Sequence, residues 1–159
     1  MSSMKLKEGD IATDFALKDK DAILHSLKNI NSDFVVVYFY PKDNTPGCTV
    51  EAQMFSKEFP SFVKLNTVVL GISGGNEASK AKFCNAHKLR ILLLSDTDLK
   101  VAKAYGAHGQ KLFMGRKYFG ITRTTFVLDK NHKILKIFDK VKPDTHAQEV
   151  LKFIEGVKK

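Results

Sequence analysis

The 159-residue sequence has two cysteines, four prolines and no tryptophan. Two cysteines are too few for the disulfide framework of a small secreted domain, so they favour an intracellular protein with redox-active thiols. No apolar run approaches the ~20 residues of a transmembrane helix, and residues 1–10 lack the apolar core of a secretion signal. These absences predict a cytoplasmic protein that does not enter a membrane.

Acidic residues are also scarce, with 17 Asp and Glu against 26 Lys and Arg, which gives a formal net charge of +9. This excess raises the alternative of a basic nucleic-acid-binding module. The lysines are spread along the chain, however, and no zinc-ligand spacing or aromatic-basic RNA motif is present. The five histidines share no metal-site spacing either. We therefore expect no specific nucleic-acid partner and no metal, with weak, salt-sensitive adhesion to polyanions as the alternative.

Internal repeats, low-complexity tracts and linkers are absent, which predicts one domain over residues 1–159. Hydrophobic periodicity and turn residues define its elements. The expected elements are a hairpin (15–17 and 22–24), a short helix (25–30), buried strands (35–40, 67–73 and 91–94), helices (48–59, 77–89 and 99–105), a loop (108–120), an antiparallel strand pair (122–128 and 133–141) and a last helix capped by Thr145. Two β-α-β units followed by a hairpin and a helix predict an α/β sandwich.

The most informative stretch joins the first buried strand to the helix that follows it. Residues 35–40 are all β-branched or aromatic, as in a strand buried on both faces of a parallel sheet. Pro41 ends the strand, residues 42–47 are typical of a turn, and Cys48 stands in the first turn of the predicted helix. Pro60 marks the end of that helix or a kink in it.

Cys48 at a helix start lies where free N–H groups and the helix dipole stabilise a thiolate. A thiol with a pKa of roughly 8.5 is only about 3% ionised at pH 7, and a pKa of ~5.5 ionises nearly all of it. Nucleophilicity falls as the pKa falls, so the two effects nearly cancel. A fast Cys48 therefore needs other groups that stabilise the transition state.

Those groups are suggested by a family resemblance. Residues 41–48 contain the pattern P-x-x-x-T-x-x-C, and YFYPKDNTPGCT together with the later GITRTTFVLD resembles the bacterioferritin comigratory protein group, the Q-type peroxiredoxins. The resemblance covers almost the whole chain. It implies a thioredoxin-like fold, with a central mixed β-sheet flanked by helices and an N-terminal β-hairpin.

The resemblance also assigns roles to four residues. It implies that Cys48 is the peroxidatic cysteine, that the Thr45 hydroxyl bonds thiolate and peroxide, that the Pro41 ring shields the thiolate, and that Arg123 holds the thiolate charge and orients the peroxide. The alternatives are a structural thiol for Cys48, a surface ion pair for Arg123 and a turn or cap role for Thr45. For Glu51, in the first turn of the same helix, capping is at least as well supported as catalysis.

Cys84 is the candidate resolving cysteine. Many members of the group carry that cysteine five residues after the peroxidatic one, where this chain has Gln53, and a smaller part place it in the later helix that contains Cys84. Its helical neighbours include Lys80 and Lys88, which predicts an electropositive, accessible edge rather than the core. The alternative is a one-cysteine peroxidase in which Cys84 is a spectator.

The resemblance thus implies a thiol peroxidase for hydrogen peroxide and organic hydroperoxides. A Cys48 sulfenic acid would condense with Cys84, and a thioredoxin-type donor would reduce the disulfide. No metal, flavin or haem cofactor is expected, and the resemblance implies a monomer or weak homodimer. A thioredoxin-like disulfide oxidoreductase is the other alternative, but Glu51 stands where a Cys-x-x-Cys motif would have its second cysteine.

Overall fold

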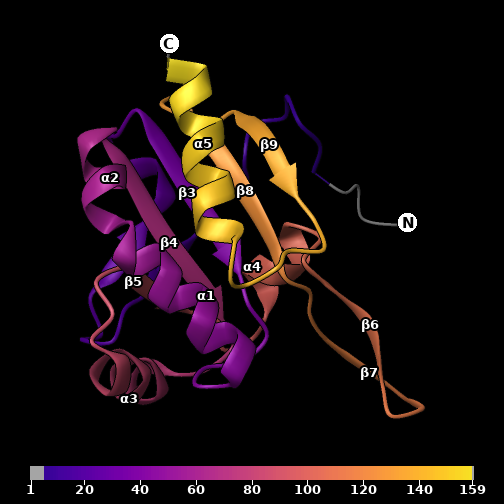
Figure 1. Ribbon diagram of the computed structural model, residues 1–159. Coiled ribbons are helices and arrows are strands. Elements are labelled where there is room, and N and C mark those ends of the chain that lie inside the picture. Colours follow the sequence, from indigo (N-terminus) through magenta and orange to yellow (C-terminus); the bar gives the residue numbers. More distant parts are fainter. Residues whose placement is uncertain (1–5, 159) are drawn as a thin grey trace.

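Seven strands form one mixed sheet in the order β2-β1-β5-β4-β3-β8-β9 (Figure 1). The computed structural model describes residues 6–158, so half of the stretch considered as a secretion signal lies outside the described residues. β3, β4 and β5 are parallel, and the other neighbours are antiparallel. The strands are β1 (Ala16–Lys18), β2 (Leu24–Ser26), β3 (Phe34–Phe39), β4 (Thr67–Ser73), β5 (Leu92–Ser95), β8 (Thr124–Asp129) and β9 (Ile134–Phe138).

β3 is the central strand on which both cores are built, as the apolar run predicted. All six of its side chains are buried. Because side chains alternate along a strand, Val35, Val37 and Phe39 enter one core cluster and Val36 and Tyr38 enter the other. The end of β3 is therefore fixed from both faces, and the loop that follows it leaves from a rigid point.

Helices cover both faces of this sheet. α1, α2, α3 and α5 contribute side chains to the cluster that contains Tyr38, whereas η1 and α4 contribute to the opposite cluster. The helices are η1 (Leu27–Asn29, a 3₁₀ turn), α1 (Pro46–Lys57), α2 (Phe59–Lys64), α3 (Glu77–His87), α4 (Lys100–Ala104) and α5 (His146–Lys158). The predicted α/β sandwich with an N-terminal hairpin is confirmed, and Pro60 stands at the start of a separate short helix. Within residues 6–158, no helix combines the length and the apolarity that a bilayer-spanning segment requires.

The predicted loop over residues 108–120 is wrong, because this segment forms a second sheet of two strands. β6 (His108–Phe113) and β7 (Arg116–Ile121) pair as a hairpin that projects from the body (Figure 1). Met114 and Gly115 at its tip both have positive φ, as a tight two-residue hairpin turn requires. Most of its described apolar side chains are exposed, with Leu112 69% and Phe119 72% accessible, and Ile121 at its base is buried. The hairpin therefore lacks the hydrophobic pattern of a packed strand.

Two other boundaries also differ from expectation. The helix predicted over residues 25–30 is only the short η1, because its first two residues pair with β1. The strand predicted from residue 122 begins at Thr124, so Thr122 and Arg123 lie in the break between β7 and β8. Arg123 is thus free of strand pairing, next to the carboxyl end of β3.

Candidate active site

Cys48 is the third residue of α1. Thr45 is the extended N-cap residue, and Pro46 occupies the first helical position, where its missing N–H costs nothing. The first intrahelical hydrogen bond runs from the Thr49 N–H to the Thr45 carbonyl at 2.8 Å, so the Gly47 and Cys48 N–H groups precede the helix ladder. The Cys48 side chain is buried, with only 1% of its surface accessible. The free N–H groups of the helix start therefore lie beside a sulfur that is shielded from water.

Arg123 holds two acidic groups with one guanidinium. Its Nη2 lies 3.5 Å from Cys48 Sγ, and its Nη1 donates to Glu51 Oε1 at 2.8 Å. Burial works to lower the pKa of Arg123, but the neighbouring Cys48 and Glu51 outweigh burial and raise it. A Cβ on Gly47 would lie 3.2 Å from Nη2, so the glycine leaves room for the guanidinium beside the thiol.

Glu51 belongs to this site through its bond to Arg123, whereas the sequence left both a capping and a catalytic role open for it. Its side chain is fully buried, and among the described residues its Oε2 has no hydrogen-bond partner. Burial raises the pKa of Glu51 to about 7, although Arg123 acts in the opposite direction. The available signal was its position three residues after Cys48, which places both side chains on one side of the helix.

Thr45 and Pro41 are both half-buried in the loop between β3 and α1. The Thr45 hydroxyl donates to the Lys42 carbonyl at 3.1 Å and makes no capping bond to the helix. Thr45 therefore stabilises the turn, one of the two structural roles expected for it. Its oxygen still has lone pairs with which to meet a ligand.

The predicted accessible edge for Cys84 is wrong. Cys84 is 6% accessible and shares a core cluster with Cys48, and both thiols are free. α3 turns Lys80, Phe83 and Cys84 inward and leaves Ala78 exposed, which reverses the expected orientation. The reason is that Lys80 has a buried partner carboxylate. Burial raises the pKa of the Cys84 thiol.

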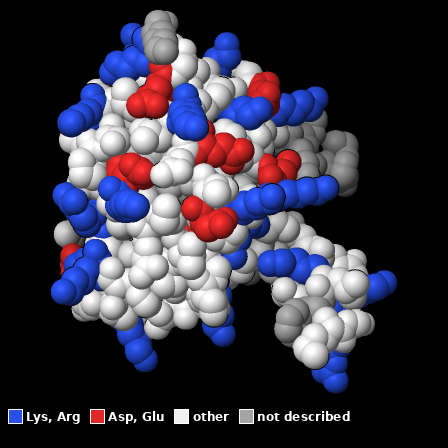
Figure 2. Space-filling view, viewed as in Figure 1, with Lys and Arg blue, Asp and Glu red and all other residues white. Residues whose placement is uncertain are grey.

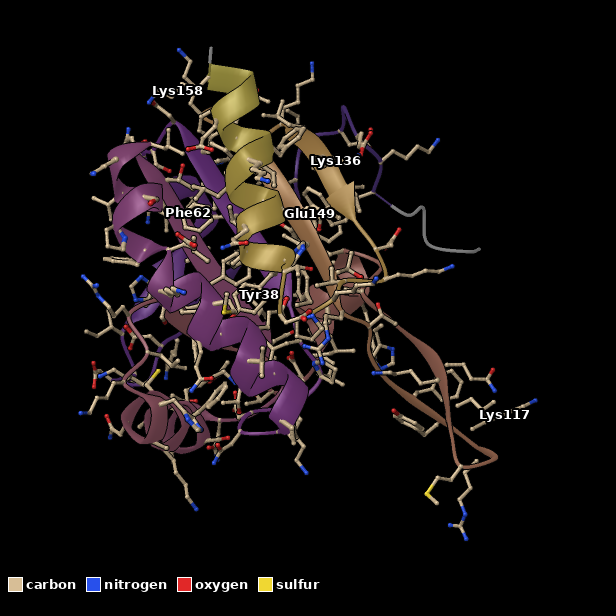
Figure 3. All side chains as sticks on the ribbon, viewed as in Figure 1. Tyr38, Phe62, Lys117, Lys136, Glu149 and Lys158 are labelled. Atoms are coloured by element: carbon tan, nitrogen blue, oxygen red, sulfur yellow. The ribbon has the colours of Figure 1, made fainter. Side chains whose placement is uncertain are left out.

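The Tyr38 ring fixes α1 against the sheet. It stacks on Phe55 of α1 with ring centroids 4.6 Å apart, beside the helix in Figure 3. A Cβ on Gly71 of the neighbouring strand would approach this ring to 2.7 Å, so only glycine leaves it room. The Tyr38 hydroxyl is buried and has no hydrogen-bond partner among the described residues.

An open groove of about 540 Å³ adjoins the site. Arg123 lines it together with the base of the β6–β7 hairpin and the segment after β9, including Gly109 and Val141. Within residues 6–158, no three His, Cys, Asp or Glu side chains are grouped so that they could hold a metal ion. On the face shown in Figure 2, basic side chains are interspersed with acidic ones over the body, whereas the hairpin sequence from residue 108 to 121 has no acidic residue.

Comparison with known proteins places this arrangement in a family. The family model described as AhpC/TSA family matches residues 9–137. The chain belongs to this family of peroxiredoxins. The putative peroxiredoxin bcp of Helicobacter pylori is 46% identical over 147 residues, covering 92% of this chain and 97% of the relative. The peroxiredoxin Bcp of Escherichia coli K12 is 39% identical over 150 residues, covering 94% and 96%.

Solved structures agree with this assignment. The bacterioferritin comigratory protein of Xanthomonas campestris, studied for its alkyl peroxide reduction, superposes with a TM-score of 0.86 at 30% identity over 91% of this chain and 92% of that one. Peroxiredoxin Q of Xanthomonas campestris has been solved with serine replacing a cysteine at position 48 or at position 84, the numbers that the two cysteines carry here. The peroxiredoxin is thus a thiol peroxidase of the Bcp (Q-type) group, and its thioredoxin-like fold is confirmed.

Proposed function

We propose that this peroxiredoxin reduces hydrogen peroxide and organic hydroperoxides with Cys48 and completes its cycle through a Cys48–Cys84 disulfide. The Cys48 thiolate attacks one peroxide oxygen, the O–O bond breaks, and the second oxygen leaves as water or alcohol after taking a proton. Cys48 becomes a sulfenic acid. The electrons come from thiols, so the cycle requires no metal, flavin or haem.

The observation that carries the proposal is the contact of 3.5 Å between Arg123 Nη2 and Cys48 Sγ. A guanidinium fixed by Glu51 is already in place where negative charge moves from sulfur to the peroxide oxygens. The N–H groups at the helix start supply the other donors, the Thr45 oxygen can accept a hydrogen bond from the peroxide through its free lone pairs, and Pro41 limits water at the loop. These are the roles that the family pattern predicted for them.

The groove beside Arg123 supports the inclusion of organic hydroperoxides. Its volume of about 540 Å³ leaves room for an alkyl group once the peroxide lies against the guanidinium. The alkyl peroxide activity studied in the Xanthomonas campestris protein supports the same substrate class.

Cys84 is the proposed resolving cysteine. Its sulfur attacks the Cys48 sulfur, an S–S bond forms, the S–OH bond breaks, and the hydroxyl leaves as water with the Cys84 proton. A thioredoxin-type dithiol, available in the cytoplasm, then returns both thiols by exchange. Cys84 shares a core cluster with Cys48, which supports this pairing.

Peroxide consumption with thioredoxin, thioredoxin reductase and NADPH tests the proposal. Cys48→Ser should abolish turnover with every peroxide and donor, because an alcohol cannot supply the nucleophile at neutral pH. Appreciable turnover by the pure variant would refute the assignment. Full turnover in Cys84→Ser, with that variant reduced directly by the donor, would instead support the one-cysteine cycle.

A further inference from the structure

Lys80 is a buried lysine that the peroxidase chemistry does not use. Its side chain has no accessible surface. The ammonium donates to Asp43 Oδ2 at 2.9 Å, to Ser73 Oγ at 2.7 Å and to the Gly75 carbonyl at 3.1 Å. All three of its protons are therefore used, as burial of this charge demands.

Asp43, the partner of Lys80, is equally enclosed, with a side chain that is 4% accessible. Besides the ammonium, its carboxylate accepts from three hydroxyls, those of Tyr40 at 2.5 Å, Ser79 at 2.6 Å and Ser73 at 3.3 Å. The pair is thus a saturated polar network inside the fold. If only one of the two charged residues is removed, the other is left as an uncompensated buried charge.

This network joins the two segments that carry the cysteines. Asp43 stands in the loop between β3 and α1, five residues before Cys48, and Lys80 stands on α3 one turn before Cys84. A second, exposed hydrogen bond joins the same segments, between Asn44 Oδ1 in the loop and the α3 residue His87 at 2.8 Å.

The glycine before α3 shows how closely the two segments approach. A Cβ on Gly75 would lie 2.1 Å from Asp43 Oδ2, so this contact requires glycine.

We propose that Lys80 is a positioning residue, which acts through Asp43 to hold the peroxidatic loop and α3 together and so sets the rate at which Cys84 reaches Cys48. The inference rests on the proposed two-cysteine cycle. While the pair is intact, Cys48 stays beside Arg123 and is ready for peroxide. When the pair separates, both charges gain water and the two helix starts can leave their places.

In this proposal opening precedes condensation, because the two thiols are buried and each is held by its own helix. A disulfide needs Cα atoms roughly 4.4–6.8 Å apart and aligned Cβ vectors. The condensation itself forms one S–S bond and releases one water, and it needs no further reactant. Its rate is therefore governed by how often the Asp43–Lys80 pair opens, which is a local unfolding equilibrium.

Replacing Lys80 should change two steps in opposite directions. In Lys80→Met, the unpaired Asp43 carboxylate disfavours the closed state. Disulfide formation from the sulfenic acid should then accelerate by about tenfold, whereas the reaction of Cys48 with peroxide should slow because the loop is less ordered. Asp43→Asn combined with Lys80→Met removes both charges and should return both rates toward wild type.

The two rates are separable by rapid-quench mass spectrometry with stoichiometric peroxide, which follows the sulfenic acid and the disulfide as distinct masses, with the cross-link confirmed by peptide mapping. Lys82→Met, an exposed lysine on the same helix, is the matched control and should leave both rates unchanged. A merely structural role would lower stability without the opposed shifts. If Lys80→Met does not fold, Ser79→Ala removes one bond to Asp43 and should shift both rates in the same directions by a smaller factor.

Unchanged or slower disulfide formation in Lys80→Met, or in Ser79→Ala where it is needed, overturns the inference while the proposed function stands. Absence of any Cys48–Cys84 cross-link in the wild type refutes the proposed cycle itself, and the inference with it. The double variant Asp43→Asn/Lys80→Met shows whether the change in the rates comes from the unpaired charge or from altered packing. If it keeps the phenotype of Lys80→Met, the effect does not come from the ion pair and the inference fails.

Discussion

Arg123 is the positively charged residue that lies against both Cys48 and Glu51. One guanidinium nitrogen meets the thiol and the other is bound by Glu51, so the planar fork is used on both sides. A lysine keeps the charge but loses the fork. Arg123→Lys should therefore slow sulfenic acid formation by about 10²-fold, as when one preorganised donor is removed from an active site. Single-turnover kinetics with reduced protein measure this rate, and an unchanged rate would show that Arg123 is structural.

Glu51 gives the site a pH dependence. Its pKa of about 7 in the folded protein lies above its ordinary value of 4.5, mainly because it is buried. The folded state therefore binds more protons between these values. The resulting stabilisation is complete below pH 4.5 and is lost as the pH rises through 7.

Replacing Glu51 by glutamine should remove this dependence, because an amide does not titrate. Between the two pKa values the wild type should lose on the order of 3 kcal/mol in its free energy of unfolding relative to Glu51→Gln. Urea titrations across this pH range measure the difference. Parallel pH profiles for the two proteins would contradict the raised pKa.

Among the elements, the β6–β7 hairpin is placed to affect peroxide selectivity, because its base lines the groove beside Arg123. A Cβ on Gly109 meets no atom within 4 Å, so a large side chain fits there without strain. Gly109→Trp should raise the KM for cumene hydroperoxide by about tenfold, which corresponds to roughly 1.4 kcal/mol of lost binding free energy. The KM for hydrogen peroxide should stay unchanged. Gln110→Trp is the control, since neighbouring strand residues face opposite sides. Equal effects on both peroxides would exclude the groove as the alkyl site.

The elements that sequence predicted well are those with packed apolar patterns. β3 and α1 could be predicted because an apolar run, a proline stop and turn residues are local signals. The β6–β7 hairpin could not be predicted, since Leu112, Tyr118 and Phe119 along it face solvent. The inward face of α3 was missed for another reason: Lys80 is buried only because Asp43, 37 residues earlier, neutralises it. Such a pairing depends on tertiary structure and leaves no local pattern.

At the scale of the whole molecule, the site is an assembly of distant segments at the end of the sheet where β3 and β4 finish and β8 begins. Three segments meet there because β3, β8 and β4 are neighbours in the sheet. They are α1 with Cys48, the segment before β8 with Arg123, and α3 with Cys84. The family pattern predicted Cys48 and Arg123 as partners, and the fold places them in contact. The active-site geometry does not explain the net charge of +9, so the weak adhesion of the protein to polyanions stays a prediction.

The central claim is that the two cysteines form one redox pair, and peptide mapping of peroxide-treated wild type tests it most directly. After one equivalent of peroxide, a peptide that contains both Cys48 and Cys84 should appear, and thioredoxin should remove it. In Cys84→Ser, Cys48 should persist as a sulfenic acid and become overoxidised at high peroxide. If Cys84 stays reduced in the wild type while Cys48 cycles, the two-cysteine account is contradicted and a one-cysteine enzyme takes its place.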